Sequence, residues 1–274
     1  MKKVFEYLGL LSLMCFSFFI TEKTVTVIQE VDDIMIQIKE NKDNYYKEGL
    51  EATMEADYII PGISSRVVNV DKSYQAMKKI GVYDQNFLVF DVTKPDIILK
   101  NHLDKYIVKG NYSKRMISLI FLVEDNQIKE ILNQIGDIKV SFVVRNYDMK
   151  ADSMNLEKAK ELGHEILIYE EASTEYSSYM KKMNMMNIDI HYCYNPNKKQ
   201  SFLDLCKKNK QYSIYTDNVV TNKPLQTVKN MLEPGAIIVF ETNSVLLQEL
   251  PNIISHIEYK GYSIESLDNH LQEN

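Results

Sequence analysis

The sequence predicts an α/β fold in which a mostly parallel β-sheet is covered by helices. Residues Met116–Val123 form a continuous apolar run, which is typical of a strand that is buried on both faces. Short apolar runs then alternate with helix-like segments to the end of the chain, and repeated βα units of this kind predict parallel strands. The chain has 274 residues, which is enough for one large domain or for one domain plus a smaller leader. Hydrophobic residues make up 45%, so a sizeable core can be buried.

The order of the elements after Asn111 follows from this alternation. We expect strands at Met116–Val123, Val140–Val144, Glu165–Tyr169, Ile188–Tyr194, Tyr212–Tyr215, Ala236–Phe240 and Tyr262–Ser266. We expect helices at Asn126–Ile135, Asn155–Leu162, Thr174–Met186, Gln200–Lys208, Pro224–Met231 and Leu246–Tyr259. Gly163 follows the second of these helices and is a suitable C-cap residue.

A leader, residues 24–110, precedes this domain. Val27, Val31, Ile34 and Ile38 recur at helical spacing and predict one apolar stripe on a helix. Such a stripe packs against a core, or it forms a short membrane-proximal stalk that self-associates. Fewer than three heptads are present, which is little support for a coiled coil.

The rest of the leader predicts short elements. Pro61-Gly62 indicates a turn, and Val67–Val70 suits a strand. We expect Asp71 to cap a helix that begins at Lys72, and Phe87–Phe90 to form a further strand.

The N-terminus carries a targeting pattern. Lys2 and Lys3 precede an apolar, uncharged run from Tyr7 to Ile20, which is typical of a signal peptide or signal anchor. No small-residue cleavage site follows it, so we expect residues 1–23 to be an uncleaved transmembrane anchor; the alternative is a buried core helix. The positive-inside rule places the lysines in the cytoplasm. The chain would then be a single-pass protein of the cell membrane with its C-terminal domain outside the cytoplasm.

The net charge and the cysteines limit the binding partners, disulfides and metal sites that the sequence predicts. The net charge is −6 and the pI is about 5.5, and no basic stripe is present, so we expect no nucleic-acid partner. Outside the predicted anchor, Cys193 and Cys206 either form a disulfide or are small buried side chains. No Cys/His spacing indicates a zinc site held by thiolates.

Residues 111–274 resemble the NodB-type polysaccharide deacetylases, carbohydrate esterase family four. The resemblance rests on Lys114–Phe121, Gly163–Ile166, Leu232–Ile238 and Gly261–Ile264. It implies a distorted, incomplete (β/α) barrel. The segments Pro61-Gly62, Val68–Val70 and Lys72–Tyr74 also resemble a leader that precedes this domain in some Gram-positive relatives.

The resemblance also implies a site, which this chain lacks. The family holds a divalent metal with an aspartate and two histidines and uses a second aspartate as general base. At the two aspartate positions this chain has Leu122 and Val123, and at the two histidine positions it has Tyr169 and Ser173. Glu241 takes the place of the histidine that ends the last motif. We therefore expect no catalytic residue, no bound metal and no other cofactor, as in a pseudoenzyme.

Several polar and aromatic residues follow predicted strands and could line a pocket at the barrel mouth. They are Glu124, Asp125, Glu170, Glu171, Glu241, Tyr192 and Tyr194. The acids form a polar rim, a cation site with oxygen ligands, or an acid/base pair, and the tyrosines could stack on a glycan.

We expect a glycan-binding or scaffolding module of the cell envelope, with cell-wall polysaccharide or an envelope protein as partner. Two alternatives stay open. One is a divergent carbohydrate deacetylase or hydrolase that acts on N-acetyl groups of cell-wall or surface polysaccharide. The other is a module for protein interaction only.

Overall fold

The computed structural model describes residues 11–18, 20, 32–123, 127–144, 149–170 and 175–274. The chain divides into two compact units. The first comprises Met1–Gly49 and Ser64–Thr93, and the second comprises Leu50–Ile63 and Lys94–Asn274. The sequence that we describe as a leader is thus divided between the two units.

The first unit is a small α+β structure. Its elements are α2 (Asp33–Asn41), the 3₁₀ turn η1 (Lys42–Tyr45), β3 (Ser65–Val68), α3 (Val70–Lys78), the 3₁₀ turn η2 (Gln85–Phe87) and β4 (Phe90–Thr93). Ile34 and Ile38 of α2 pack in a core with Tyr74 and Met77 of α3, which confirms core packing for this part of the predicted stripe. Val27 and Val31 lie outside the described residues.

Two details of this unit differ from the sequence prediction. The cap of α3 is Asn69, whose side-chain oxygen accepts a hydrogen bond from the N–H of Lys72 at 2.9 Å. The prediction of Asp71 was wrong, because the helix begins at Val70, two residues before Lys72. The predicted strand Phe87–Phe90 is also wrong. Its first residue closes the turn η2, and the strand β4 begins at Phe90.

The second unit contains the large sheet. Its strands are β1 (Thr53–Met54), β2 (Tyr58–Ile60), β5 (Tyr106–Ile107), β6 (Met116–Val123), β7 (Ser141–Val144), β8 (Glu165–Tyr169), β9 (Tyr192–Tyr194), β10 (Tyr212–Ile214), β11 (Val219–Val220), β12 (Ile237–Glu241) and β13 (Ser263–Ile264). The order is β1-β2-β5-β10-β9-β8-β7-β6-β12-β11, with β13 also paired to β6. All pairs are parallel except β1 with β2, so the predicted parallel sheet is confirmed.

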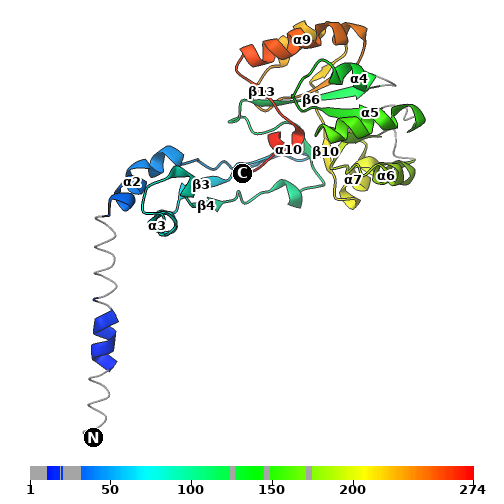
Figure 1. Ribbon diagram of the computed structural model, residues 1–274. Coiled ribbons are helices and arrows are strands. Elements are labelled where there is room, and N and C mark those ends of the chain that lie inside the picture. Colours follow the sequence, from blue (N-terminus) through cyan, green and yellow to red (C-terminus); the bar gives the residue numbers. More distant parts are fainter. Residues whose placement is uncertain (1–10, 19, 21–31, 124–126, 145–148, 171–174) are drawn as a thin grey trace. The chain divides into compact units, whose positions relative to one another are not determined.

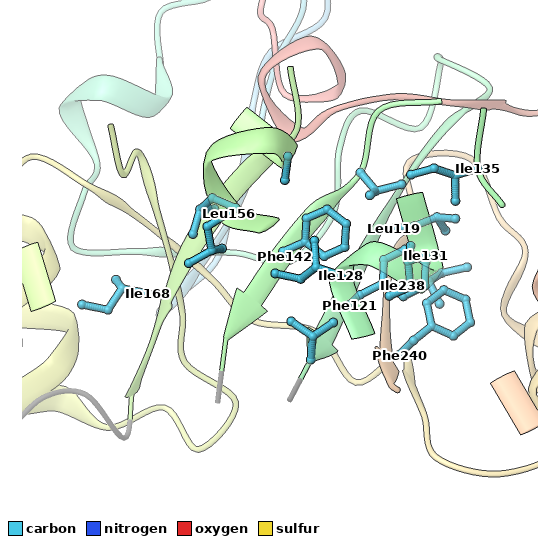
Figure 2. Packing of buried hydrophobic residues seen from close by; sticks show 14 of the residues in the cluster. Leu119, Phe121, Ile128, Ile131, Ile135, Phe142, Leu156, Ile168, Ile238 and Phe240 are labelled. Atoms are coloured by element: carbon cyan, nitrogen blue, oxygen red, sulfur yellow. The ribbon is translucent and has the colours of Figure 1, made fainter. Parts of the chain in front are cut away.

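Helices cover the outer face of this sheet (Figure 1). They are α4 (Gln127–Leu132), α5 (Met149–Glu161), α6 (Tyr176–Met185), α7 (Gln200–Lys208), α8 (Pro224–Met231) and α9 (Ser244–Tyr259); the short helices η3 (Leu99–Asn101) and α10 (Leu267–His270) complete the unit. Figure 2 shows Leu119 and Phe121 of β6 among Ile128, Ile131 and Phe142 in the layer between strands and helices. All of these side chains are fully buried. Leu119 and Phe121 lie on one face of β6 because alternate residues of a strand point to the same side.

The remaining strand residues form a second buried cluster on the inner face. Ile120 and Leu122 of β6, Val143 of β7 and Leu167 of β8 belong to it. A sheet with one apolar layer facing the helices and another facing inward is the arrangement of a curled half-barrel. The runs Met116–Val123 and Glu165–Tyr169 match the predicted strands because both of their faces are buried.

The segment before β3 differs from the prediction. Pro61-Gly62 makes no turn but continues the extended chain. A Cβ atom on Gly62 would lie 2.5 Å from the backbone oxygen of Leu50 and 2.8 Å from the nitrogen of Ala52. This glycine therefore permits close backbone contact between two extended segments.

The predicted anchor, residues 1–23, lies largely outside the described residues. Residues 11–18 are helical, and their large apolar side chains are exposed: Leu11, Leu13, Met14, Phe16 and Phe18. Within the ranges that the structure describes, no helix is long and apolar enough to cross a membrane.

Candidate functional site

The carboxyl ends of the parallel strands form the edge where barrel enzymes place their sites. In this chain the described end of β6 carries buried apolar side chains at that edge. Leu122 points to the inner cluster and is 4% exposed, whereas Val123 points to the helices and is fully buried. Leu122 lies beside Val143 of β7 and Glu241 of β12 in the sheet register. An aliphatic residue therefore occupies the inward position at the centre of the edge.

Two tyrosines fill the neighbouring part of the barrel interior. Tyr169 ends β8 and is paired in register with Tyr194 of β9. Their rings are stacked, with centroids 5.9 Å apart and planes inclined by 19°. Tyr169 is 9% exposed and Tyr194 is 1% exposed. Their aromatic faces therefore pack in the inner cluster.

Tyr192 belongs to the same cluster. It is 4% exposed, and its hydroxyl donates a hydrogen bond to Asp268 Oδ1 at 2.8 Å. Burial raises its pKa above the ordinary range, with the nearby carboxylate of Asp268 as a further cause. Tyr192 and Tyr194 thus lie inside the barrel rather than on an open rim, because the period of two along β9 points both of them inward.

The structure describes two of the five acids predicted at the mouth. Glu170 is buried, and its carboxylate accepts hydrogen bonds from the backbone N–H of Asn197 at 3.2 Å and from the Asn197 side-chain amide. Glu241 is partly exposed at the end of β12, and the strands β7 and β6 lie between it and Glu170. Glu124, Asp125 and Glu171 lie outside the described residues, as does Ser173.

The residues present do not fit the metal that the family uses. Leu122 offers no ligand atom, and Tyr169 has its ring in the apolar cluster instead of an imidazole at the mouth. Among the described residues no three His, Cys, Asp or Glu side chains gather in a way that could hold a metal ion. No chemical step through a metal can be built from this part of the site.

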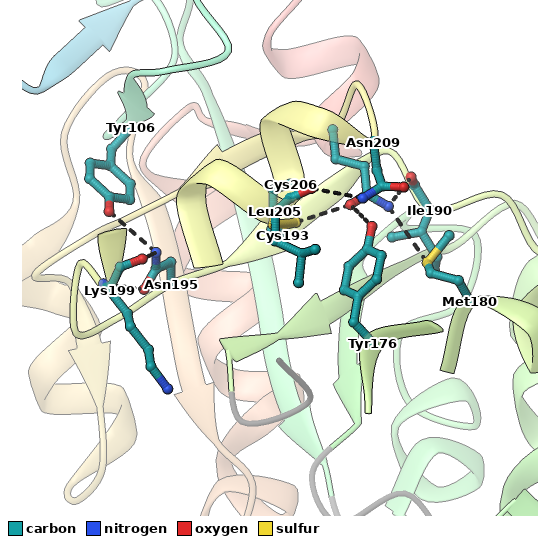
Figure 3. The surroundings of a disulfide bond; sticks show 11 residues. Tyr106, Tyr176, Met180, Ile190, Cys193, Asn195, Lys199, Leu205, Cys206 and Asn209 are labelled. Carbon is teal, nitrogen blue, oxygen red and sulfur yellow. Dashed lines mark hydrogen bonds between the residues drawn. A yellow bond between two sulfur atoms is a disulfide. The ribbon is translucent and has the colours of Figure 1, made fainter. Parts of the chain in front are cut away.

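The loop after β9 carries polar residues that the sequence analysis did not single out. Asn195 is fully buried, and its Oδ1 accepts from the N–H of Lys199 at 2.9 Å, while its Nδ2 donates to the hydroxyl of Tyr106 at 3.3 Å (Figure 3). Burial raises the pKa of Tyr106 to about 12. The Asn-Pro pair of Asn195 and Pro196 is a turn signal that could have indicated this loop.

A disulfide joins Cys193 of β9 to Cys206 of α7, with Cα atoms 6.5 Å apart (Figure 3). Of the two possibilities that the sequence left open, the structure therefore contains the disulfide. Gln211 lies beside it and is buried: its Oε1 accepts from Tyr176 at 2.6 Å, and its Nε2 donates to the carbonyl of Ile190 at 3.0 Å.

Comparisons with known proteins show which proteins have a similar sequence or a similar fold. No protein-family model matches the chain. The uncharacterized protein YlxY of Bacillus subtilis (strain 168) is 22% identical over 277 residues, which cover 91% of this chain and 87% of that protein. BA3943 from Bacillus anthracis, a CE4 family pseudoenzyme, has a similar structure, with a TM-score of 0.66 at 20% identity over 88% of this chain and 96% of that one.

A deacetylase and a carbohydrate esterase are similar in structure over less of the chain. The peptidoglycan N-acetylglucosamine deacetylase Bc1960 has a TM-score of 0.54 at 14% identity and covers 62% of this chain and 94% of its own. The family 4 carbohydrate esterase PdaA of Bacillus subtilis has a TM-score of 0.52 at 14% identity and covers 63% and 86%. This chain has the polysaccharide deacetylase (NodB) fold with degenerate motifs, and the resemblance that the sequence indicated is confirmed as a likeness of fold.

Proposed function

We propose that this chain is a polysaccharide deacetylase-like protein of the cell envelope that has no deacetylase activity and binds or scaffolds glycan. The buried apolar end of β6, Leu122 and Val123, carries this proposal. A general base and a metal ligand must face the substrate, yet Leu122 is an inward aliphatic side chain and Val123 packs against the helices.

The hydrolase alternative is less well supported. A glycosidase needs two carboxyl groups that face each other across a substrate. Glu170 is buried, and its carboxylate accepts a hydrogen bond from the N–H of Asn197. Two strands separate Glu170 from Glu241 in the sheet. Glu170 and Glu241, the described acids of the mouth, therefore do not form the carboxyl pair that acid/base catalysis requires.

The similar proteins suggest the ligand class. BA3943 is a CE4 family pseudoenzyme, and Bc1960 is a deacetylase of N-acetylglucosamine in peptidoglycan. A chain that keeps this fold without its catalytic groups has a scaffold suited to the same kind of polymer, so we infer an N-acetylated cell-wall polysaccharide as partner.

We also propose that residues 1–23 anchor the protein in the cell membrane with the larger unit outside the cytoplasm. Lys2 and Lys3 precede the apolar run, and its described side chains, including Leu13 and Phe16, are exposed. The Cys193–Cys206 disulfide supports an oxidising compartment, because such bonds seldom persist in the cytosol.

Co-sedimentation tests the binding function. The full-length chain, purified in mild detergent, is mixed with insoluble peptidoglycan and centrifuged. We expect the protein in the pellet, and competition by soluble N-acetylglucosamine oligosaccharide should return it to the supernatant. Protein that stays in the supernatant throughout would contradict the glycan-binding function and favour the protein-interaction alternative.

Alkaline carbonate extraction of cell membranes tests the anchor. The unchanged chain should remain with the membranes, whereas Leu13→Arg combined with Phe16→Arg should release it, since a charged side chain at the centre of a span costs about 3 kcal/mol. Release of the unchanged chain would contradict the anchor.

A further inference from the structure

A polar cleft lies at the carboxyl ends of β5 and β10, and none of its lining residues is a position where the family motifs are lost. Its volume is about 290 Å³, near the lower limit of ligand pockets. It is lined by Tyr58, Val108, Lys109, Tyr215, Thr216, Asp217, Asn218 and Glu233. The cleft therefore offers room for one ring-sized group and its substituents.

One wall of the cleft is a pair of tyrosine rings. The rings of Tyr58 and Tyr215 are nearly parallel, with planes inclined by 15° and centroids 5.9 Å apart. The ammonium group of Lys198 lies 4.7 Å and 4.1 Å from the two centroids and donates a hydrogen bond to the Tyr58 hydroxyl. Lys198 is not among the residues that line the cleft, so its contacts hold the two rings in place without adding a side chain to the cleft wall.

Further contacts fix the orientation of Tyr215. Its hydroxyl donates a hydrogen bond to Asp217, and its ring meets the edge of the buried Tyr106 at 6.2 Å. A ring that is already oriented loses little conformational entropy when a ligand packs on it. The aromatic wall is thus prepared for stacking.

The other groups of the cleft are hydrogen-bonding side chains of mixed charge. Lys109 and Glu233 form an ion pair at 3.6 Å and are 30% and 54% exposed. Asp217 is exposed, and Asn218 presents a side-chain amide. These side chains supply both donors and acceptors. Two acids, Asp217 and Glu233, face one base, Lys109, so the formal charge of the cleft is only −1. The cleft suits a neutral group with several hydroxyls better than a phosphate or an apolar chain.

We propose that this cleft binds a single pyranose ring of a neutral or N-acetylated glycan. The C–H face of the sugar packs on Tyr58 and Tyr215, and its hydroxyl or acetamido groups bond to Lys109, Asp217 and Glu233. The inference rests on the proposed glycan-binding function and assigns it to these residues. The wall exists because β2 pairs with β5 and β5 with β10, which brings Tyr58 beside Tyr215.

Isothermal titration calorimetry of the full-length chain in mild detergent tests this site, with a soluble N-acetylglucosamine oligosaccharide as the probe. Tyr58→Ala and Tyr215→Ala should each weaken binding about tenfold or more, because each removes a stacking ring. Tyr215→Phe keeps the ring and should stay within about threefold of the unchanged chain. Tyr259→Ala is the matched control, since this tyrosine of α9 is 84% exposed and outside the cleft.

Circular dichroism of each variant separates lost binding from lost fold. If a tyrosine variant is unfolded, Asp217→Ala replaces it, because that side chain is exposed and its loss should weaken binding about tenfold without changing the fold. Equal affinity of the cleft variants and Tyr259→Ala overturns this site while the proposed function stands. Absence of oligosaccharide binding by the unchanged chain, in calorimetry and in co-sedimentation, overturns both.

Discussion

At the scale of single residues, the aliphatic side chains at positions 122 and 123 contribute to the packing of the core. Two aspartates at positions 122 and 123 would place carboxylates where this chain has two buried aliphatic side chains. An unpaired buried carboxylate is costly, and neighbouring carboxylates repel each other when no metal is bound. Leu122 and Val123 avoid that cost and extend the apolar strand.

Val123→Asp should lower the free energy of unfolding by about 2–4 kcal/mol, because the position is fully buried among the helices. Urea unfolding at neutral pH in excess chelator measures the change. Val245→Asp is the control: this residue is 49% exposed in the first turn of α9, where an acid is tolerated. An unchanged midpoint for Val123→Asp would mean that the strand end is solvated.

Restoring both aspartates should not restore activity. We expect the double variant Leu122→Asp and Val123→Asp to release no acetate from acetylated chitin oligosaccharides, even with added zinc. Neither Tyr169 nor Ser173 supplies an imidazole, and Val123 points away from the barrel interior. Acetate release above the level of the unchanged chain would show that other residues complete the metal site.

At the scale of elements, the disulfide connects the strand β9 to the helix α7 that covers it. The cysteines are separated by 13 positions, and a loop of that length stabilises a folded chain by about 2–4 kcal/mol. Cys193→Ala combined with Cys206→Ala should therefore lower the free energy of unfolding by about that amount. Guanidinium unfolding with and without reductant measures it, and reductant should affect the unchanged chain but not the double variant. A reductant-insensitive unchanged chain would contradict the bond.

The short helix α10 carries a pH-sensitive contact. His270 is fully buried, its Nδ1 lies 2.8 Å from Ser118 Oγ, and burial lowers its pKa to about 4. In the unfolded chain the pKa returns to about 6.5, so the unfolded state binds a proton that the folded state does not. The stabilising effect of the neutral ring is complete above about pH 6.5 and is lost as the pH falls toward 4.

From pH 7 to pH 5, His270 alone should therefore cost the unchanged chain about 2 kcal/mol of unfolding free energy. Glu165 and Glu273 have raised pKa values through burial and act in the opposite direction at lower pH. His270→Asn isolates the histidine, because the variant lacks its titration and should lose less stability over the same interval. Parallel pH curves for the two proteins would contradict this assignment.

These elements also show how far sequence reasoning reaches. The runs Met116–Val123 and Glu165–Tyr169 were predictable because their apolar character is continuous. The helix α10 was missed because four residues carry too little periodicity. The burial of Tyr192 and Tyr194 was missed because the two tyrosines share one face of a three-residue strand, and an amphipathic tyrosine suits either a rim or a core.

At the scale of the whole molecule, the unpredicted features depend on contacts between distant segments. Nothing local in Tyr58–Ile60 indicates that this strand pairs with β5 and so extends the large sheet. The cleft wall of Tyr58 and Tyr215 follows from that pairing and has no motif of its own. The loss of the catalytic groups, in contrast, could be seen in the sequence, because the family places them at fixed distances from recognisable segments.

The central claim is that a deacetylase fold persists here without deacetylase chemistry. Acetate release from N-acetylglucosamine oligosaccharides and from peptidoglycan, with the full-length chain in mild detergent and added zinc, tests it most directly. We expect no release above a blank without protein, and no stoichiometric transition metal in the protein after purification without chelator. Measurable turnover that Glu241→Gln abolishes would contradict the claim and establish this chain as a divergent hydrolase.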